Sequence, residues 1–458
     1  MINKYFYTKI CVVLAVVLLN MASCKKNKSV EEVKPEVVGR TVYVPKELAS
    51  MNLNSPTSIW SYSRSKQSDH FVVFWGAGYG ALDPNSTDVP TEFRFNVDAV
   101  LAKAEECYEI NVNKVKMAVV GNGKSNLDKY KMMIFVYYTT TYMANAAGYD
   151  DTIGALWVNP AIVKPPAGTF THEVGHMFQY QVNCDLKGTS GFRHGYGGNN
   201  GNSFWESTAQ WQSHQSYATD IFNITQFTAY INGYNKHVLH ESQRYCNYFI
   251  HHYWANKHGV DFIGRLWRES RAPEDAIHTY MKLAKLNVEQ LNDELYDASK
   301  RFVTWDIDNL RTYGANYIGK HTYGFTSVGN GVYRVAYNNC PQTTGYNVIP
   351  LTLPAAGTVV SIDFKGIPNT AGFNPVDASI AGWRYGYVAL LTDGTRVYGD
   401  MAKGTTNKVS FTVPQNCSKL WFVVTGAPSQ YMSTAWDDIA TNDEQWPYEV
   451  KFTNSSII

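Results

Sequence analysis

Nine residues near position 175 constrain this chain more than any other stretch. Residues 171–179 read Thr-His-Glu-Val-Gly-His-Met-Phe-Gln and contain the pattern His-Glu-x-x-His. His172 and His176 are four positions apart, so on a helix they would lie one turn apart on the same face. Two imidazoles in that arrangement can bind one metal ion, and Glu173 between them can serve as general base for a water activated there. The stretch therefore predicts a helix that carries a zinc site.

The neighbouring residues predict the limits of this helix. Pro165 and Pro166 interrupt the chain, so the helix should begin near Thr169 and end near residues 182–183. Gly175 lies in its interior, where glycine costs about 1 kcal/mol relative to alanine. A glycine at this position predicts close approach of another backbone or of a substrate.

A third ligand is needed, because a catalytic zinc usually takes three protein ligands and one water. Glu206 is the preferred candidate, in a helical pattern over residues 204–211 and 206 − 176 = 30 positions beyond the second histidine. The third histidine of a metzincin would fall at position 182, which is Val182, so that class is excluded. The alternative third ligands are Cys184, Asp185 and His194.

Two further segments bear on catalysis. Residues 152–158 predict a strand just before the metal helix, either an edge strand that would pair with a substrate backbone or an ordinary core strand. Residues 236–258 predict a long helix that carries Tyr245 and His240. Either side chain could donate a hydrogen bond to the oxyanion of the transition state, and packing or surface positions are the alternative.

The remaining pattern predicts an α+β protein with two domains. Strands are expected over 71–76, 114–120 and 129–138, and helices over 96–109, 260–269, 273–284 and 288–303. From about residue 323 the chain becomes a series of short alternating runs separated by turns. We therefore expect a mixed sheet with active-site helices over residues 41–322 and a β-sandwich or jelly roll over 323–458.

The first forty residues predict export and a lipid anchor. Lys4 and Lys9 precede an apolar run over 10–19, and Met-Ala-Ser-Cys at 21–24 is typical of a bacterial lipobox. We expect a signal peptide over 1–23, lipidation of Cys24 and a solvated tether over 24–40. Lys25 favours an outer-membrane lipoprotein, periplasmic or surface-exposed, in a Gram-negative cell envelope. A plain secretory signal is the alternative.

Charge and aromatic content limit the partners. Forty Lys and Arg against 39 Asp and Glu leave no electrostatic case for a nucleic-acid partner. Membrane contact is expected through the lipid anchor only. Four aromatic residues of the C-terminal region could stack on sugar rings or belong to the core: Trp383, Tyr385, Trp421 and Trp446.

Two stretches carry a resemblance to known peptidases. His-Glu-Val-Gly-His-Met-Phe-Gln at 172–179 and Trp-Glu-Ser-Thr-Ala at 205–209 resemble the two halves of a gluzincin active site, and the first is similar to enhancin-like, mucin-cleaving peptidases. The mature chain also resembles a group of uncharacterised bacterial secreted proteins and lipoproteins with a β-rich tail.

The resemblance implies that His172, His176 and Glu206 bind Zn2+ and that Glu173 is the base. It implies a zincin-like fold and a protein or glycoprotein substrate. The alternative expectation is a non-catalytic surface lipoprotein that binds glycans or glycoproteins on a degenerate zincin scaffold.

Overall fold

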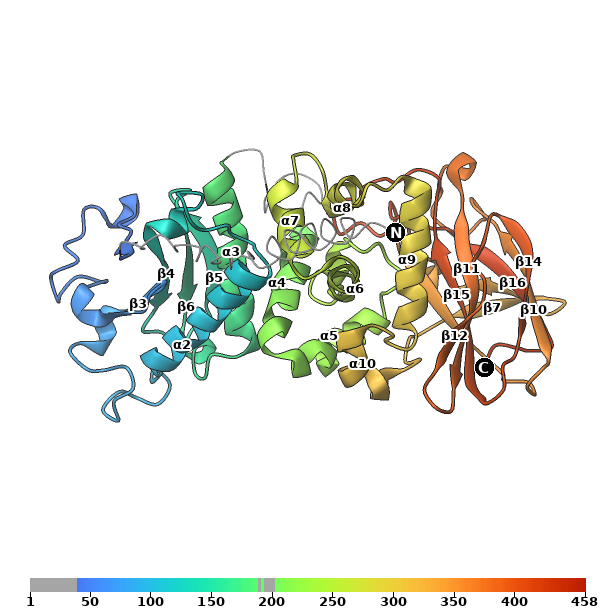
Figure 1. The fold of residues 1–458 in the computed structure, drawn as a ribbon, viewed down its shortest axis with the longest axis horizontal. Coiled ribbons are helices and arrows are strands. Elements are labelled where there is room, and N and C mark those ends of the chain that lie inside the picture. The colour runs from blue at the N-terminus through green and yellow to red at the C-terminus, as the bar shows by residue number, and fades with distance from the viewer. Residues whose placement is uncertain (1–38, 188–190, 193–201) are drawn as a thin grey trace, which may run out of the picture. The chain divides into compact units, whose positions relative to one another are not determined.

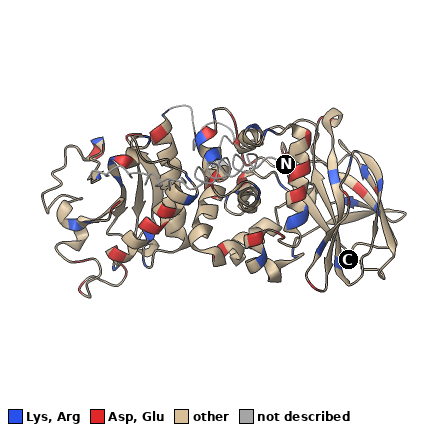
Figure 2. Cartoon of the chain, viewed as in Figure 1, with Lys and Arg blue, Asp and Glu red and all other residues tan. Residues whose placement is uncertain are grey.

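The computed structural model describes residues 39–187, 191–192 and 202–458. The predicted signal peptide, the Cys24 lipidation site, residues 24–38 of the tether and the alternative ligand His194 lie outside these residues. Within the described chain, no helix is both long enough and apolar enough to cross a membrane. Lys/Arg and Asp/Glu residues are interspersed along the ribbon (Figure 2), as the balanced composition suggests.

A mixed six-stranded sheet forms the N-terminal part of the fold (Figure 1). Its order is β2-β3-β4-β6-β5, with β1 also paired to β4. β3, β4 and β6 run parallel, whereas β2 and β5 pair antiparallel at the two ends of this order. The strands are β1 (Thr41–Val42), β2 (Ser65–Gln67), β3 (Phe71–Trp75), β4 (Tyr130–Val136), β5 (Ala144–Tyr149) and β6 (Ile153–Val158).

Helices cover this sheet and continue the chain beyond it. Asn96 caps α2 by accepting a hydrogen bond from the backbone of Ala99, and the buried residues of α2 recur with helical periodicity. The α-helices of the described chain are α2 (Val97–Tyr108), α3 (Gly168–Leu186), α4 (Asn202–Ser216), α5 (Ile224–Ile231), α6 (Phe249–His258), α7 (Asp261–Glu269), α8 (Ala276–Ala284), α9 (Val288–Phe302) and α10 (Asp308–Gly314).

The C-terminal part consists of two antiparallel sheets. One has the order β14-β10-β16-β8-β7, and the other β12-β11-β15-β9 with β13 paired to β11. Apolar residues of both sheets, such as Ile362, Phe364 and Phe422, form one hydrophobic cluster. The strands are β7 (Phe325–Gly329), β8 (Val332–Val335), β9 (Tyr346–Leu351), β10 (Val359–Gly366), β11 (Trp383–Leu391), β12 (Arg396–Tyr398), β13 (Ala402–Lys403), β14 (Thr406–Thr412), β15 (Cys417–Gly426) and β16 (Tyr448–Thr453).

The helical region packs directly on these sheets. α9 contacts β11 and β15 (Figure 1), and Arg384 of β11 donates a 2.6 Å hydrogen bond to the Asp293 carboxylate of α9. Val388, Trp421 and Val423 belong to the hydrophobic cluster of the N-terminal part. The strand-rich part of the chain begins at β7. The exact domain limits stay a prediction.

The α+β class is confirmed, and two predicted elements are wrong. The strand predicted over 114–120 is absent, because α2 continues into a π-helical segment over Glu109–Lys114 and the chain then packs on α7. The helix predicted over 236–258 begins only at Phe249. Both errors lie outside the segments that carry the two histidines and Glu206.

Candidate metal centre and its cavity

The metal helix α3 is held between the sheet and α4 by two glycines. A Cβ at Gly154 of β6 would lie 2.4 Å from the Met177 backbone oxygen of α3. A Cβ at Gly175 would lie 2.9 Å from Gln212 Oε1 and 3.4 Å from the Ala209 Cα of α4. Gly154 has no room for a side chain, and at Gly175 a side chain would displace the Gln212 amide and press on the α4 backbone. The expectation that Gly175 allows close approach of another backbone is confirmed, and that backbone is α4.

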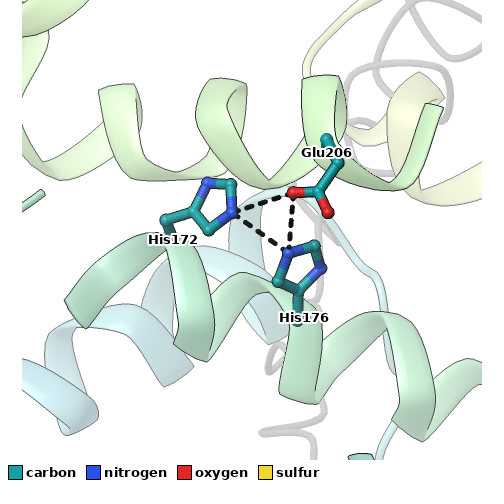
Figure 3. Close-up of side chains that lie close together, drawn as sticks. All are labelled: His172, His176 and Glu206. Atoms are coloured by element: carbon teal, nitrogen blue, oxygen red, sulfur yellow. Dashed lines mark hydrogen bonds and ion pairs between the residues drawn. The ribbon is translucent and has the colours of Figure 1, made fainter. Parts of the chain in front are cut away.

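The structure brings together the three predicted ligands (Figure 3). His172 and His176 point from α3 toward Glu206 on α4. The distance between the two Nε2 atoms is 3.1 Å, and each lies 3.2 Å from Glu206 Oε2. Tetrahedral zinc with ligands at about 2.0–2.1 Å separates its ligand atoms by about 3.3–3.4 Å. The triangle is therefore close to the size that zinc requires.

Two glutamines fix the orientation of the imidazoles. Gln210 Oε1 lies 2.7 Å from His172 Nδ1, and Gln179 Oε1 lies 2.8 Å from His176 Nδ1. The Gln179 amide nitrogen donates to the Trp205 backbone oxygen, so its carbonyl must face the histidine. Since a carbonyl oxygen only accepts, each Nδ1 carries the proton and each Nε2 turns a lone pair toward Glu206. Three electron-pair donors that face one another fit a cation.

Burial and neighbouring charges have opposite effects on the pKa values of Glu206 and His176. Burial disfavours the Glu206 carboxylate, but positive charge on the two imidazoles, which would then also donate from Nε2, outweighs burial and lowers the Glu206 pKa well below its usual range. In the neutral tautomer set by the glutamines, a metal ion would supply that positive charge instead. Burial also disfavours protonation of His176, yet the Glu206 and Glu173 carboxylates and Gln179 raise its pKa overall. Both shifts show that this site favours positive charge beside an ionised Glu206.

A cavity of about 760 Å³ opens onto this triangle. Glu173 lines it beside the two histidines. Ala144, Asn145 and Ala146 of β5 form another part of its wall. A volume of this size is typical of sites for small molecules or short peptide segments. The predicted base therefore faces the space in which a substrate would lie.

The edge strand beside the metal helix is β5. The predicted strand over 152–158 exists as β6, but it pairs with β4 on one side and β5 on the other, so it is a core strand. β5 pairs only with β6 in the described sheet, and its residues, not those of β6, line the cavity. An unpaired strand edge here leaves backbone groups available to an extended chain.

The other predicted site residues fall in different places. Tyr245 lines the cavity, and its ring centroid lies 6.1 Å from that of His172. His240 does not line the cavity, because it is buried with its Nε2 atom 3.1 Å from Asp443 Oδ2. Asp185 accepts hydrogen bonds from Ser125 and from Gln181, away from the triangle. Cys184 is buried outside the cavity as well.

Sequence reasoning missed Gln210, Gln179 and the wall formed by β5. Gln210 lies four positions after Glu206, so the i to i+4 spacing on α4 was a usable signal. Gln179 follows His176 by three positions, which places it on the same helical face. β5 carried no comparable signal, since Ala-Asn-Ala-Ala-Gly-Tyr has little β-propensity.

Comparison with known proteins gives a family and little else. A family model described as "Family of unknown function (DUF6055)" matches residues 35–458. No curated protein matches the chain. Among solved structures, the crystal structure of Yersinia pseudotuberculosis-derived mitogen (YPM) matches 29% of this chain and 86% of its own, at 8% identity and a TM-score of 0.18. A likeness at that TM-score carries no argument about fold or function.

Proposed function

We propose that this chain, which belongs to the family of unknown function DUF6055, is a zinc-dependent metallopeptidase. The observation that carries the proposal is the convergence of His172 Nε2, His176 Nε2 and Glu206 Oε2 within 3.2 Å of one another. Among the residues that the structure describes, no other group of three His, Cys, Asp or Glu side chains is so arranged. In this proposal residues 41–322 form a zincin-like catalytic domain and residues 323–458 a β-sandwich.

The chain's own groups suit hydrolysis of a peptide bond. When bound by the three ligands, zinc would polarise the scissile carbonyl and activate water. Glu173 would accept the proton of that water and pass it to the leaving amine. Gln210 and Gln179 would hold the imidazoles in the tautomer that leaves each Nε2 free for the ion.

Two further elements would position the substrate. The free edge of β5 would offer backbone groups to an extended peptide in the cavity that Glu173 also lines. The Tyr245 hydroxyl would donate to the oxyanion. Burial, together with the nearby Glu206 carboxylate, raises the pKa of Tyr245, so the hydroxyl keeps its proton at neutral pH. Tyr245 is therefore preferred to His240 for this role.

The cellular setting belongs to the proposal. With Cys24 lipidated, the enzyme would act from the outer membrane on protein or glycoprotein substrates, and the C-terminal region would bind substrate or carbohydrate. Trp383, Tyr385 and Trp446 are fully buried. They therefore pack in the core and are not exposed for stacking on sugar rings. The second candidate function is a non-catalytic lipoprotein that binds glycoproteins. An intact Glu173 inside the cavity favours the enzyme.

Metal removal tests the proposal. The purified protein is expected to contain about one zinc per chain and to cleave a mixed protein and glycoprotein substrate. Dialysis against a strong chelator should abolish cleavage, and added zinc should restore it. Metal content by mass spectrometry and cleavage by gel electrophoresis give the two readouts. Zinc binding without cleavage of any substrate, combined with glycoprotein binding, would instead support the second candidate.

A further inference from the structure

One end of the cavity is built from polar groups that the proposed chemistry does not use. It lies beyond His172, where α3 begins and where α4 passes into the 3-10 turn over Ala218–Phe222. Asp220 of that turn lines the cavity there. The other residues of this end are Gly168, Thr169, Ser213, His214, Asn223 and Gln226.

The charges of this end are unbalanced. Three carboxylates line the cavity, and no Lys or Arg among the described residues does. A divalent ion on the triangle would balance Glu206 and Glu173, which leaves the negative charge of Asp220 without a counterion. Within the described chain, Asp220 forms no ion pair. A carboxylate facing a cavity in this way attracts a cationic group.

Two neutral groups beside it also lack partners. His214 has 4% of its surface exposed, and its buried Nδ1 atom has no hydrogen-bond partner in the described structure. The buried Oε1 atom of Gln226 likewise lacks one. Burial lowers the pKa of His214, so its ring stays neutral and adds no repulsion toward a cation. A buried polar atom without a hydrogen-bond partner lowers the stability of the fold unless a ligand supplies the partner.

Gly168 leaves the space in front of Asp220 open. A Cβ at position 168 would lie 3.4 Å from Asp220 Oδ2 and 3.7 Å from Ser213 Oγ. Any larger side chain at this position would therefore project toward the carboxylate. Ser213 is already occupied, since its hydroxyl lies 2.8 Å from Thr171 Oγ1 and 3.0 Å from the Gly168 backbone oxygen. The groups of this end best suited to a cationic ligand are therefore the Asp220 carboxylate and the buried Gln226 Oε1 and His214 Nδ1 atoms without partners.

We propose that this end of the cavity is a specificity subsite for a lysine or arginine side chain of the substrate, within one or two residues of the scissile bond. Asp220 would pair with the cation, and the Gln226 carbonyl would accept one of its N–H groups. A guanidinium suits this set best, because it presents several donors in a planar fork. The assignment rests on the proposed peptidase function and names the substrate class of the same cavity.

Binding measured without turnover tests the subsite. The full chain with Glu173→Gln, loaded with zinc, is titrated by calorimetry with seven-residue alanine peptides that carry a central arginine or its neutral isostere citrulline. The arginine peptide should bind about tenfold more tightly. Adding Asp220→Asn should reduce that ratio to about one. Asp69→Asn makes the same charge change at an exposed residue outside the cavity and should leave the ratio unchanged.

The outcomes separate the two proposals. Equal affinity for both peptides, no binding of either, or a tenfold ratio that survives Asp220→Asn would overturn the subsite. The peptidase proposal is judged separately by the products of the wild-type chain. Cleavage beside uncharged residues as readily as beside lysine or arginine would refute the subsite proposal but support the peptidase proposal. If the cavity prefers the arginine peptide but the chain cleaves no substrate, the subsite is supported and the peptidase proposal is refuted.

Discussion

Replacing Glu173 with glutamine is expected to lower kcat for peptide hydrolysis by about 10²–10⁴-fold, with zinc still bound. Glutamine has nearly the same shape as glutamate but cannot accept a proton at neutral pH. Glu173 lies between the two histidines on α3 and lines the cavity, yet it is not one of the three converging ligands. The loss should therefore fall on the proton transfer and spare the metal.

The measurement needs rate and metal content on the same preparation. A fluorogenic peptide identified from the wild-type digest gives kcat, and mass spectrometry gives zinc per chain. Glu92→Gln is the matched control, because Glu92 is exposed and outside the cavity, and it should behave as wild type. A Glu173→Gln variant that cleaves at the wild-type rate would refute the assigned base.

Replacing Glu206 with alanine is expected to weaken zinc binding by more than a hundredfold. Loss of an outer-shell partner of a metal ligand typically costs 10–100-fold in affinity, so loss of a ligand should cost more. The variant also removes one of the groups that raise the pKa of His176 against the effect of burial. Two histidines alone leave zinc one protein ligand short of an ordinary catalytic site.

Competition with a chromophoric chelator measures this affinity, and circular dichroism shows whether the variant is folded. Asp185→Asn tests an alternative ligand, and zinc affinity should not change, because Asp185 bonds to Ser125 and Gln181 away from the triangle. If Glu206→Ala retains wild-type affinity, Glu206 is not a ligand. His194, outside the described residues, would then be the next residue to replace.

The parts of the site that sequence could predict are those governed by local spacing. The i to i+4 relation predicted the shared face of His172 and His176. Pro165 and Pro166 indicated a start near Thr169, one residue after the observed start of α3 at Gly168. The helix runs on to Leu186, beyond the predicted end near residue 183. The prediction that Glu206 lies near the two histidines required only one assumption, that a second amphipathic helix packs on the first. The structure places it there, while its role as a ligand stays a prediction.

The parts that sequence could not predict depend on tertiary contacts. In the segment predicted as a helix before Phe249, the backbone forms turns and a 3-10 helix over Glu241–Gln243, and part of it bonds to the C-terminal region. The backbone N–H groups of His237 and Val238 donate to Gln342 Oε1 and Thr344 Oγ1. Such long-range bonds replace helical ones and override helical periodicity. They also explain why His240 is turned toward Asp443 instead of the cavity.

The polar end of the cavity could not be predicted from the sequence for a similar reason. Asp220, His214 and Gln226 are separated along the chain by elements of different type, and only packing brings them to one wall. No spacing rule connects them. The edge strand was missed because β5 is built largely from small residues, whereas the apolar β6 gave the stronger strand signal and proved to be internal.

We propose that His172, His176 and Glu206 together hold one zinc ion, and crystallography can test this directly. Diffraction data from zinc-loaded crystals, collected just above and just below the zinc absorption edge, locate that ion directly. A single strong anomalous peak is expected about 2.0–2.2 Å from both Nε2 atoms and from a Glu206 carboxylate oxygen. An absent peak in zinc-saturated crystals, or one whose ligands exclude these three side chains, would contradict it.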